Sequence, residues 1–233
     1  MSDSIRTRRR VETRARLVRA AVEVFAEQGI VASTVEQICD RAGFTRGAFY
    51  SNFDTKNAVC LEIIADETRF YTDALRRGGA AALGHFGAHP DDLRLPPYAV
   101  AGKIAELMLR PFVDVADDQR AASPDRLGLL YAELGLYAAR EPEVRAAYRS
   151  YADGMVRSLE QVLVPLLAIT GLRFRATSWE ASETILSLYE AATRHALMTA
   201  APDQVIAMVK PHVMLAFRLV TEPAGTVASS GPA

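Results

Sequence analysis

Residues 33–53 read STVEQICDRAGFTRGAFYSNF and contain two short helical patterns separated by a tight turn. Ser33 or Thr34 can cap the first helix, with a glutamate placed as in a capping box. Gly43 ends this first pattern, and Thr45 can cap the second helix only two residues later. Two short helices joined by a glycine-containing turn predict a helix-turn-helix.

A longer amphipathic helix precedes this pair, from about Glu12 to Gln28, and Gly29 ends it. Its apolar residues fall on one face at helical spacing, so this face can pack against the two short helices. These apolar residues are Leu17, Ala20, Ala21, Val24 and Phe25. The three helices together predict one helical domain over residues 12–56.

The remainder of the chain is also helical in pattern. A helix that begins after Asp54 or Thr55 fades at residues 77–79, and a loop rich in small residues, glycine and proline follows to about residue 97. Further helical patterns cover 98–118, 124–140, 142–169, 177–199 and 203–220. We therefore expect an all-α fold with a second helical domain over 57–220, and residues 221–233 as a disordered tail.

The distribution of charge separates the N-terminal part from the rest of the chain. The whole chain has 233 residues, half of them hydrophobic, and a formal net charge of -1, which alone argues against a nucleic-acid partner. Within residues 1–56, however, ten basic residues oppose seven acidic ones. Seven arginines lie in the first nineteen residues: Arg6, Arg8, Arg9, Arg10, Arg14, Arg16 and Arg19. Residues 1–11 are thus expected to form a basic N-terminal arm, which is either a solvated tail or part of a DNA-binding surface.

Other sequence features exclude several classes of protein. Cys39 and Cys60 are too few and too far apart for a zinc site or a disulfide framework, and both lie among apolar residues as small buried thiols do. We expect no metal and no cofactor. The longest apolar run, Val162 to Ile169, is too short to span a membrane, and no export signal follows the basic arm. The cytoplasm is the expected compartment.

The second short helix has side chains suited to the DNA major groove. Arg46 lies near its start, where a guanidinium can bind a guanine edge or a phosphate, and Thr45 can donate to either. Gly47 lacks a side chain, which allows the backbone to approach the bases. Tyr50 can reach a phosphate through its hydroxyl, and Lys56 can bind another. Phe49 and Phe53 are expected to anchor the helix in the core.

Residues 12–60 resemble the DNA-binding domain of the TetR family of transcriptional regulators. The matching residues are Thr13-Arg14, Ala20-Ala21, Phe25-Ala26-Glu27-Gln28-Gly29, Thr34-Val35, Ile38, Ala42-Gly43-Phe44, Thr45-Arg46-Gly47-Ala48-Phe49-Tyr50, Phe53 and Lys56. The resemblance covers about one fifth of the chain, and the helical remainder has the length that the family predicts. It implies a three-helix helix-turn-helix domain followed by a helical bundle for ligand binding and dimerisation.

The resemblance also implies which residues contact DNA. The third helix reads the operator in this family, so DNA-facing positions fall on Thr45, Arg46, Gly47, Phe49, Tyr50 and Asn52, with Thr34 and Lys56 on flanking phosphates. Asn52 departs from the family pattern, which often has His at this position, and the position of Ser51 also varies in the family. The basic arm is longer than the family minimum, so it is expected to follow the DNA backbone or to enter the minor groove.

The resemblance predicts a homodimer and an effector site in the second domain. The last two long helices would pair with those of a second subunit through Ile185, Leu188, Ala192, Val205, Val209, Val213 and Phe217, unless these residues only complete the core of one subunit. Large adaptable side chains in the second domain are candidates for a cavity that binds a hydrophobic small-molecule effector, or for the core. The candidates are Phe70, Met108, Phe112, Tyr131, Tyr151, Met155, Tyr189 and His195, and Tyr137 and Tyr148 share their pattern.

The sequence therefore predicts a ligand-responsive homodimeric regulator, in the first place a repressor that binds a palindromic double-stranded operator and is released by a small molecule. An activator of the same fold, or a regulator without an effector, is the alternative. A helical enzyme with a basic tail is a third reading, but it would need a catalytic constellation or a phosphate loop, and the four histidines lie apart. We expect no enzymatic activity.

Overall fold

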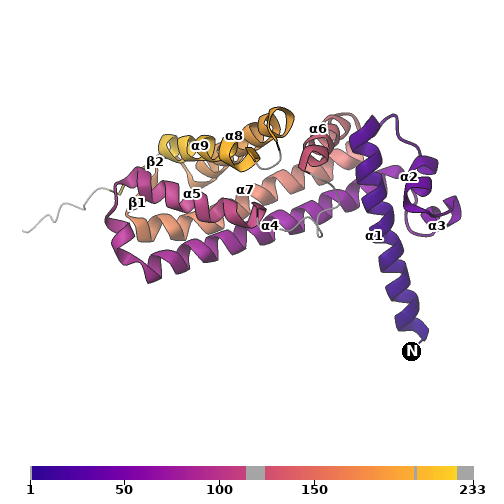
Figure 1. Cartoon of the computed structure of the whole chain (residues 1–233), viewed down its shortest axis with the longest axis horizontal. Coiled ribbons are helices and arrows are strands. Elements are labelled where there is room, and N and C mark those ends of the chain that lie inside the picture. Colours follow the sequence, from indigo (N-terminus) through magenta and orange to yellow (C-terminus); the bar gives the residue numbers. More distant parts are fainter. Residues whose placement is uncertain (1, 114–123, 202–203, 225–233) are drawn as a thin grey trace, which may run out of the picture. The chain divides into compact units, whose positions relative to one another are not determined.

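The computed structural model describes residues 2–113, 124–201 and 204–224, without the side chains of residues 2–6, 112–113, 124–128 and 206. Within these residues the chain forms nine α-helices, one short 3-10 helix and one two-stranded sheet (Figure 1). The elements are α1 (Ser2–Gln28), α2 (Val35–Ala42), α3 (Arg46–Tyr50), α4 (Lys56–Ala88), η1 (Pro90–Arg94), α5 (Pro97–Val113), α6 (Pro124–Arg140), α7 (Pro142–Thr170), β1 (Leu172–Phe174), α8 (Ser178–Thr199), α9 (Val205–Val220) and β2 (Thr221–Pro223). The predicted all-α fold is confirmed.

The chain divides into two compact units. The first contains Met1–Tyr71, Val115–Gly154 and Leu197–Asp203, and the second contains Thr72–Asp114, Met155–Ala196 and Gln204–Ala233. Helices α4 and α7 thus contribute one half to each unit. The first unit is larger than the domain of residues 12–56 that the sequence suggests, because α6 and the first half of α7 pack with it.

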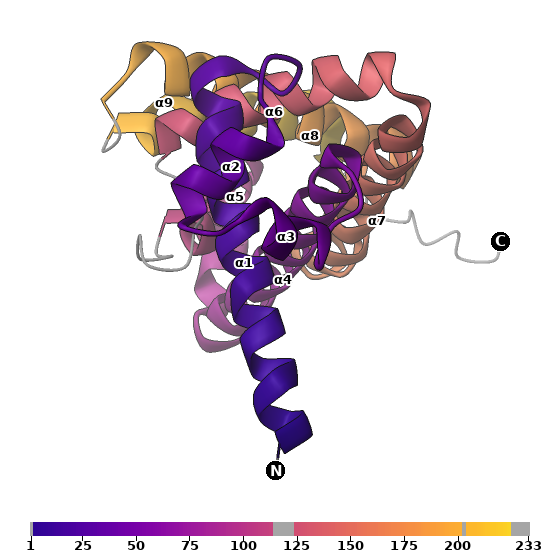
Figure 2. The same ribbon diagram turned by 90° about the vertical axis from the view of Figure 1, so that its right-hand side faces the viewer.

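Helix α1 is longer than the sequence predicts. It begins at Ser2 instead of about Glu12, so the basic arm is a continuous extension of the helix (Figure 2). Arginine is a good helix former, and the packed part of α1 supplies the nucleus from which the helix can extend. We call α2, α3 and the part of α1 from residue 13 onward the three-helix head.

Helix α4 also runs further than predicted, through the two glycines at which the sequence suggests an end. A Cβ atom at Gly78 would lie 2.9 Å from the Cα and the carbonyl oxygen of Met108, and one at Gly79 would collide with the side chain of Val162. The two glycines therefore allow close approach of α5 and α7 to α4. The expected loop shortens to the few residues between Ala88 and Pro97, with η1 inside it.

The prediction that a disordered tail begins at residue 221 is wrong. Thr221–Pro223 form strand β2, which pairs antiparallel with β1. Side chains also connect the two strands, because Glu222 of β2 forms ion pairs with Arg173 at 2.6 Å and with Arg175 at 3.2 Å. Three residues without apolar alternation give little sequence signal for a strand, and residues 225–233 lie outside the described part of the chain.

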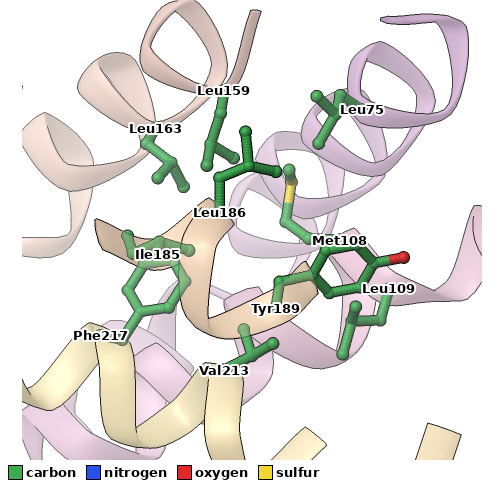
Figure 3. Close-up of a pocket in the computed structure, with 10 residues that line it drawn as sticks. All are labelled: Leu75, Met108, Leu109, Leu159, Leu163, Ile185, Leu186, Tyr189, Val213 and Phe217. Atoms are coloured by element: carbon green, nitrogen blue, oxygen red, sulfur yellow. The ribbon is translucent and has the colours of Figure 1, made fainter. Parts of the chain in front are cut away.

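The second unit contains an apolar cavity (Figure 3). Side chains from α4, α5, α7, α8 and α9 surround it, all of them within the second unit. The lining residues are Leu75, Met108, Leu109, Leu159, Leu163, Ile185, Leu186, Tyr189, Val213 and Phe217.

Candidate functional site

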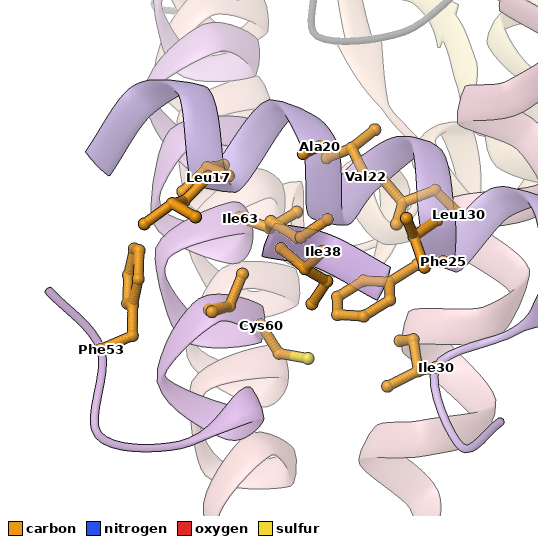
Figure 4. Close-up of a cluster of buried hydrophobic side chains, with 14 of the residues drawn as sticks. Leu17, Ala20, Val22, Phe25, Ile30, Ile38, Phe53, Cys60, Ile63 and Leu130 are labelled. Carbon is orange, nitrogen blue, oxygen red and sulfur yellow. The ribbon is translucent and has the colours of Figure 1, made fainter. Parts of the chain in front are cut away.

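The three-helix head is held together by a buried apolar core (Figure 4). Helix α2 has eight residues and α3 has five, which is too short for either to be stable alone. Ile38 of α2 and Phe49 of α3 are completely buried, and they pack in one cluster with Leu17 and Phe25 of α1. Burial of these side chains fixes α3 on the head.

The turn between α2 and α3 is fixed by its own hydrogen bonds. Gly43 adopts a left-handed conformation with φ of 70°, which ends α2 as predicted. Thr34 caps α2 in a capping box with Gln37, instead of the pair of Ser33 with Glu36. Thr45 caps α3 by accepting a hydrogen bond from the backbone N–H of Ala48 at 3.3 Å. The predicted helix-turn-helix is therefore present.

The outer face of α3 is open to solvent. Thr45, Arg46, Gly47 and Tyr50 are all exposed, and a Cβ atom at Gly47 would meet only the Oγ1 of Thr45, at 3.7 Å. The guanidinium of Arg46 forms an ion pair with Glu36 at 2.9 Å, and both side chains are more than half exposed. An exposed pair of this kind is weak, so Arg46 can exchange it for another acceptor.

Phe49 does not face outward with the others, so its assignment as a DNA-facing residue is wrong. Its side chain has no exposed surface, and its ring lies 5.8 Å from that of Phe53 and 5.5 Å from that of Tyr50. On a five-residue helix one side chain must anchor the helix to the core, and Phe49 does so. The interpretation of Phe49 and Phe53 as core anchors is the one that the structure shows.

Lys56 is directed into the head and not toward solvent. Its ammonium donates hydrogen bonds to the carbonyl oxygens of Ser33 at 2.9 Å and Val31 at 3.3 Å, and to that of Ile30. These carbonyls lie in the segment that joins α1 to α2. The structure therefore gives Lys56 a structural role, and its phosphate contact stays a prediction.

The two remaining residues predicted to contact DNA, Asn52 and Thr34, both form hydrogen bonds within the protein. The Asn52 amide donates to the carbonyl of Ala48 at 2.8 Å, and its Oδ1 atom is buried without a partner among the described residues. Its side chain is therefore directed toward α3 itself. Thr34 is exposed and its hydroxyl accepts from the backbone of Gln37 at 3.3 Å, so it stays on the surface beside the start of α2.

Two arginines of the N-terminal segment have structural roles that sequence reasoning missed. Arg14 donates to the carboxylate of Glu62 at 2.5 Å and to the carbonyl of Asn52 at 2.6 Å, and its guanidinium lies 4.1 Å from the centre of the Phe53 ring. Arg16 donates to the carbonyl of Ala42 at 2.8 Å. These partners are distant in sequence, so no local pattern identifies them.

Two of the residues predicted to bind an effector, Met108 and Tyr189, line the apolar cavity. No charged side chain is among its ten lining residues, and the Tyr189 hydroxyl is the single polar side-chain group among them. The cavity volume is about 50 Å³, well below the ~300–1,000 Å³ of typical ligand pockets. Side chains must therefore move before a drug-sized molecule can enter.

The other effector candidates lie elsewhere. Tyr131 and Tyr151 belong to an aromatic cluster of the first unit, in which Tyr71 donates to the Tyr131 hydroxyl at 3.1 Å and Tyr131 donates to Glu67 at 2.5 Å. Phe70 packs edge-on against Tyr71. These half-buried aromatic residues fit the sequence pattern of a pocket because aromatic side chains at helical spacing serve a core equally well.

Two further candidates, Met155 and His195, are not among the lining residues of the cavity. Met155 is buried, and His195 is exposed on α8 instead of lying on an inward apolar face. The side chain of Phe112 lies outside the described residues.

The apolar residues predicted to pair with a second subunit are inside the molecule. Six of the seven are buried and Leu188 is half-buried, so they complete the core of one subunit. Leu215 and Leu219, one turn apart on α9, are exposed instead, by 47% and 57%. Their spacing puts both on one face of the helix.

Both cysteines are buried, as the sequence predicts. Burial raises the pKa of the Cys60 thiol to about 12 and raises that of Cys39 as well. Such thiols stay protonated at neutral pH and are poor nucleophiles. Among the described residues, no group of histidine, cysteine and carboxylate side chains could hold a metal ion, and no helix is long and apolar enough to cross a membrane.

Comparison with known proteins places the head in a family. Residues 17–63 match the model of the bacterial regulatory proteins of the tetR family. The chain is 46% identical over 54 residues to the uncharacterized HTH-type transcriptional regulator TtgW of Pseudomonas putida, and 41% identical over 51 residues to the HTH-type transcriptional repressor KstR2 of Rhodococcus jostii. These matches cover 23% and 22% of this chain, and 40% and 25% of the two relatives. The chain therefore matches less than half the length of either relative, and both are regulators, as the sequence predicts here.

Solved structures show the same fold over nearly the whole chain. The SmeT–triclosan complex has a TM-score of 0.61 at 20% identity and covers 95% of this chain and 100% of that one. The transcriptional regulator FadR of Bacillus subtilis, in complex with stearoyl-CoA, has a TM-score of 0.61 at 17% identity and covers 87% of this chain and 96% of its own. At these identities the likeness concerns the fold alone.

Proposed function

Because the chain belongs to the tetR family of bacterial regulatory proteins, we propose that it is a homodimeric transcriptional repressor that binds a palindromic operator and is released by a small-molecule effector. The exposed face of α3 carries this proposal: Thr45, Arg46, Gly47 and Tyr50 are the outward residues of a helix whose position is fixed by a buried phenylalanine. Binding to chromosomal DNA would place the protein in the cytoplasm.

The residue types on this face suit direct contact with a DNA groove. An arginine near the start of a recognition helix can form paired hydrogen bonds with guanine, which is the commonest specific contact. The missing side chain at Gly47 leaves room for the DNA backbone or a base edge beside Arg46. The Tyr50 hydroxyl and the Thr34 side chain would bind phosphates, which position the helix without reading sequence. Phe49 supports this surface from inside the head, and Lys56 braces the segment that joins α1 to α2.

Dimerisation follows from the small size of the reading surface. One helix-turn-helix contacts few base pairs, so high specificity requires two heads on two half-sites about one helical turn apart. The exposed leucines Leu215 and Leu219 give α9 an apolar face on its outer side. We propose that this face, together with α8, packs against the same helices of a second subunit, in place of the buried residues that the sequence suggests.

The effector is inferred from the lining of the cavity in the second unit. Ten apolar or aromatic side chains without a charged group favour a lipophilic, uncharged molecule or an uncharged part of one. The complexes of SmeT with triclosan and of FadR with stearoyl-CoA support a ligand in this fold. The likeness of the head to part of KstR2, which is a transcriptional repressor, supports repression.

DNA binding by the purified protein tests this function. A preferred duplex would be selected from a random library, and binding to it and to a scrambled duplex would then be followed by fluorescence anisotropy. The Arg46→Ala variant should lose about 1–3 kcal/mol of the preference for the selected duplex. Arg76→Ala is the matched control, because Arg76 is an exposed arginine of the second unit with only an ion pair to Asp73. Equal affinity of the wild type for selected and scrambled duplexes would overturn the proposal.

A further inference from the structure

The described side chains at the N-terminal end of α1 are open to solvent. Every side chain from residue 7 to residue 12 is exposed, and Leu17 is the first buried one among the described side chains of the helix. Figures 1 and 2 both show this end of α1 extending away from α2 and α3. At about 1.5 Å per residue, Arg8 lies about 9 Å along the helix beyond Arg14, which is fastened to the head. This end of the helix is continuous with the packed part of α1.

Three consecutive arginines, Arg8, Arg9 and Arg10, lie on this extension, and all three side chains are exposed. Arg14 and Arg41, in contrast, are engaged with Glu62, Glu23 and Glu27. Successive residues on an α-helix point about 100° apart, so the three guanidinium groups spread over about 200° of its circumference. Positive charge on several sides of an exposed helix suits an anionic surface larger than one carboxylate, such as a row of DNA phosphates.

The extension leaves the head beside the end of α3. Arg14 donates to the carbonyl of Asn52 and lies over the ring of Phe53, and these two residues directly follow α3. The arginines N-terminal to Arg14 therefore project past the C-terminal end of the helix that we propose to enter the major groove. When a helix lies in that groove, the sugar-phosphate backbone borders its ends.

We propose that the described part of the basic arm, residues 7–11, is a rigid helical arm that binds the DNA phosphates bordering the groove occupied by α3. This inference rests on the proposed function, and it adds a second contact region that reads charge and not sequence. Because the arm is already helical, it loses less conformational entropy on binding than a disordered tail of the same composition. Each phosphate that it neutralises releases condensed counterions, which makes its contribution strongly dependent on salt.

The salt dependence of binding measures this contribution directly. The variant Arg8→Ala/Arg9→Ala/Arg10→Ala keeps good helix formers and removes three charges. Arg76→Ala/Arg77→Ala/Arg94→Ala is the matched control, because it removes three exposed arginines of the second unit and changes the net charge equally. The logarithm of affinity for the selected duplex would be plotted against the logarithm of salt concentration for the wild type and both variants. Circular dichroism and thermal unfolding would confirm that all three are folded.

We expect the slope of the arm variant to be shallower than that of the wild type by about 0.9 per lost phosphate contact, hence by up to about 3. Its ratio of affinities for selected and scrambled duplexes should stay within twofold of the wild-type ratio, because the arm does not read bases. Ethylation interference should show that the arm variant has lost sensitivity at phosphates adjacent to those affected by Arg46→Ala. The control variant should have the wild-type slope.

A slope of the arm variant equal to that of the wild type would overturn the inference, and so would an equal decrease in the control variant. Failure of the proposed function would look different, since the wild type itself would then show no preference for any duplex. Val11→Pro tests the helical character of the arm, because proline interrupts the helix while all three charges remain. An unchanged slope for Val11→Pro would overturn the part of the inference that requires a rigid arm.

Discussion

The carboxylate of Glu133 accepts a hydrogen bond from the backbone N–H of Ile30, with 3.2 Å between Oε2 and N. Ile30 is completely buried and follows Gly29, whose φ of 82° ends α1. Glu133 lies on α6, more than one hundred residues further along the chain. A side chain of α6 therefore satisfies a backbone group of the three-helix head where the chain turns from α1 toward α2.

This contact predicts a stability effect for Glu133. Glu133→Ala leaves a buried N–H group without an acceptor, so the free energy of unfolding should fall by about 1–3 kcal/mol. Glu133→Gln retains a neutral acceptor and should cost about half as much. Urea unfolding followed by circular dichroism measures both. Glu183→Ala, at an exposed position of α8, is the control and should stay within about 0.5 kcal/mol of the wild type. The contact is unimportant if Glu133→Ala matches this control.

The glycines of α4 predict opposite effects of one substitution. Replacing glycine by alanine inside a helix normally stabilises it by about 0.5–1 kcal/mol. At Gly84 nothing lies within 4 Å of the added Cβ atom, so Gly84→Ala should show this gain. At Gly78 the added atom would lie 2.9 Å from the backbone of Met108, which cannot rotate away. Gly78→Ala should therefore destabilise the protein by about 1–3 kcal/mol.

Thermal unfolding of the two alanine variants distinguishes these effects. Gly78→Ala should melt below the wild type and Gly84→Ala above it. If both variants are stabilised, α5 does not approach α4 as closely at Gly78 as the structure shows.

The same glycines explain one limit of prediction from the sequence. A Gly-Gly pair is a common helix terminator, so the local sequence predicts that the helix ends at Gly78 and Gly79. Only the closeness of α5 and α7 shows that these glycines are packing positions inside a longer helix. The two short helices of the head, in contrast, were predictable because Gly43 and the caps Thr34 and Thr45 are local signals.

The features of the candidate site also differ in whether local sequence or tertiary packing determines them. The exposure of Arg46, Gly47 and Tyr50 follows from their positions on a short helix, and a sequence pattern can indicate it. The burial of Phe49 and the engagement of Lys56 with carbonyls of another segment depend on tertiary packing. The cavity was predictable only in character, because an apolar lining assembled from five helices has no local spacing rule.

Phe49 and Tyr50 should separate stability from DNA binding. Phe49→Ala removes a fully buried ring and should lower the free energy of unfolding by about 3–5 kcal/mol. Tyr50→Ala alters an exposed side chain, so stability should change little and affinity for the selected duplex should fall. Urea unfolding and anisotropy titrations measure the two quantities on the same samples. A Phe49→Leu variant that stays folded should keep its preference for the selected duplex, and loss of this preference would restore Phe49 as a DNA contact.

The burial of Cys60 predicts how stability changes at high pH. Desolvation raises its pKa to about 12 in the folded protein, whereas an unfolded thiol titrates near ~8.5. The folded state therefore holds the proton over a range in which the unfolded state releases it. The contribution of Cys60 to stability is complete below the unfolded pKa and is lost as pH rises toward 12.

The expected slope can be isolated by comparison with Cys60→Ala. Between pH 9 and pH 10 the wild type should lose about 1 kcal/mol more of its unfolding free energy than the variant does, because one additional proton leaves on unfolding. The comparison cancels the titration of tyrosine and lysine side chains, which both proteins share. Urea unfolding at several pH values, under reducing conditions, gives the two slopes. Parallel slopes would mean that the Cys60 thiol ionises as easily in the folded protein as in the unfolded chain, and the buried position of Cys60 in the core of the head would then be wrong.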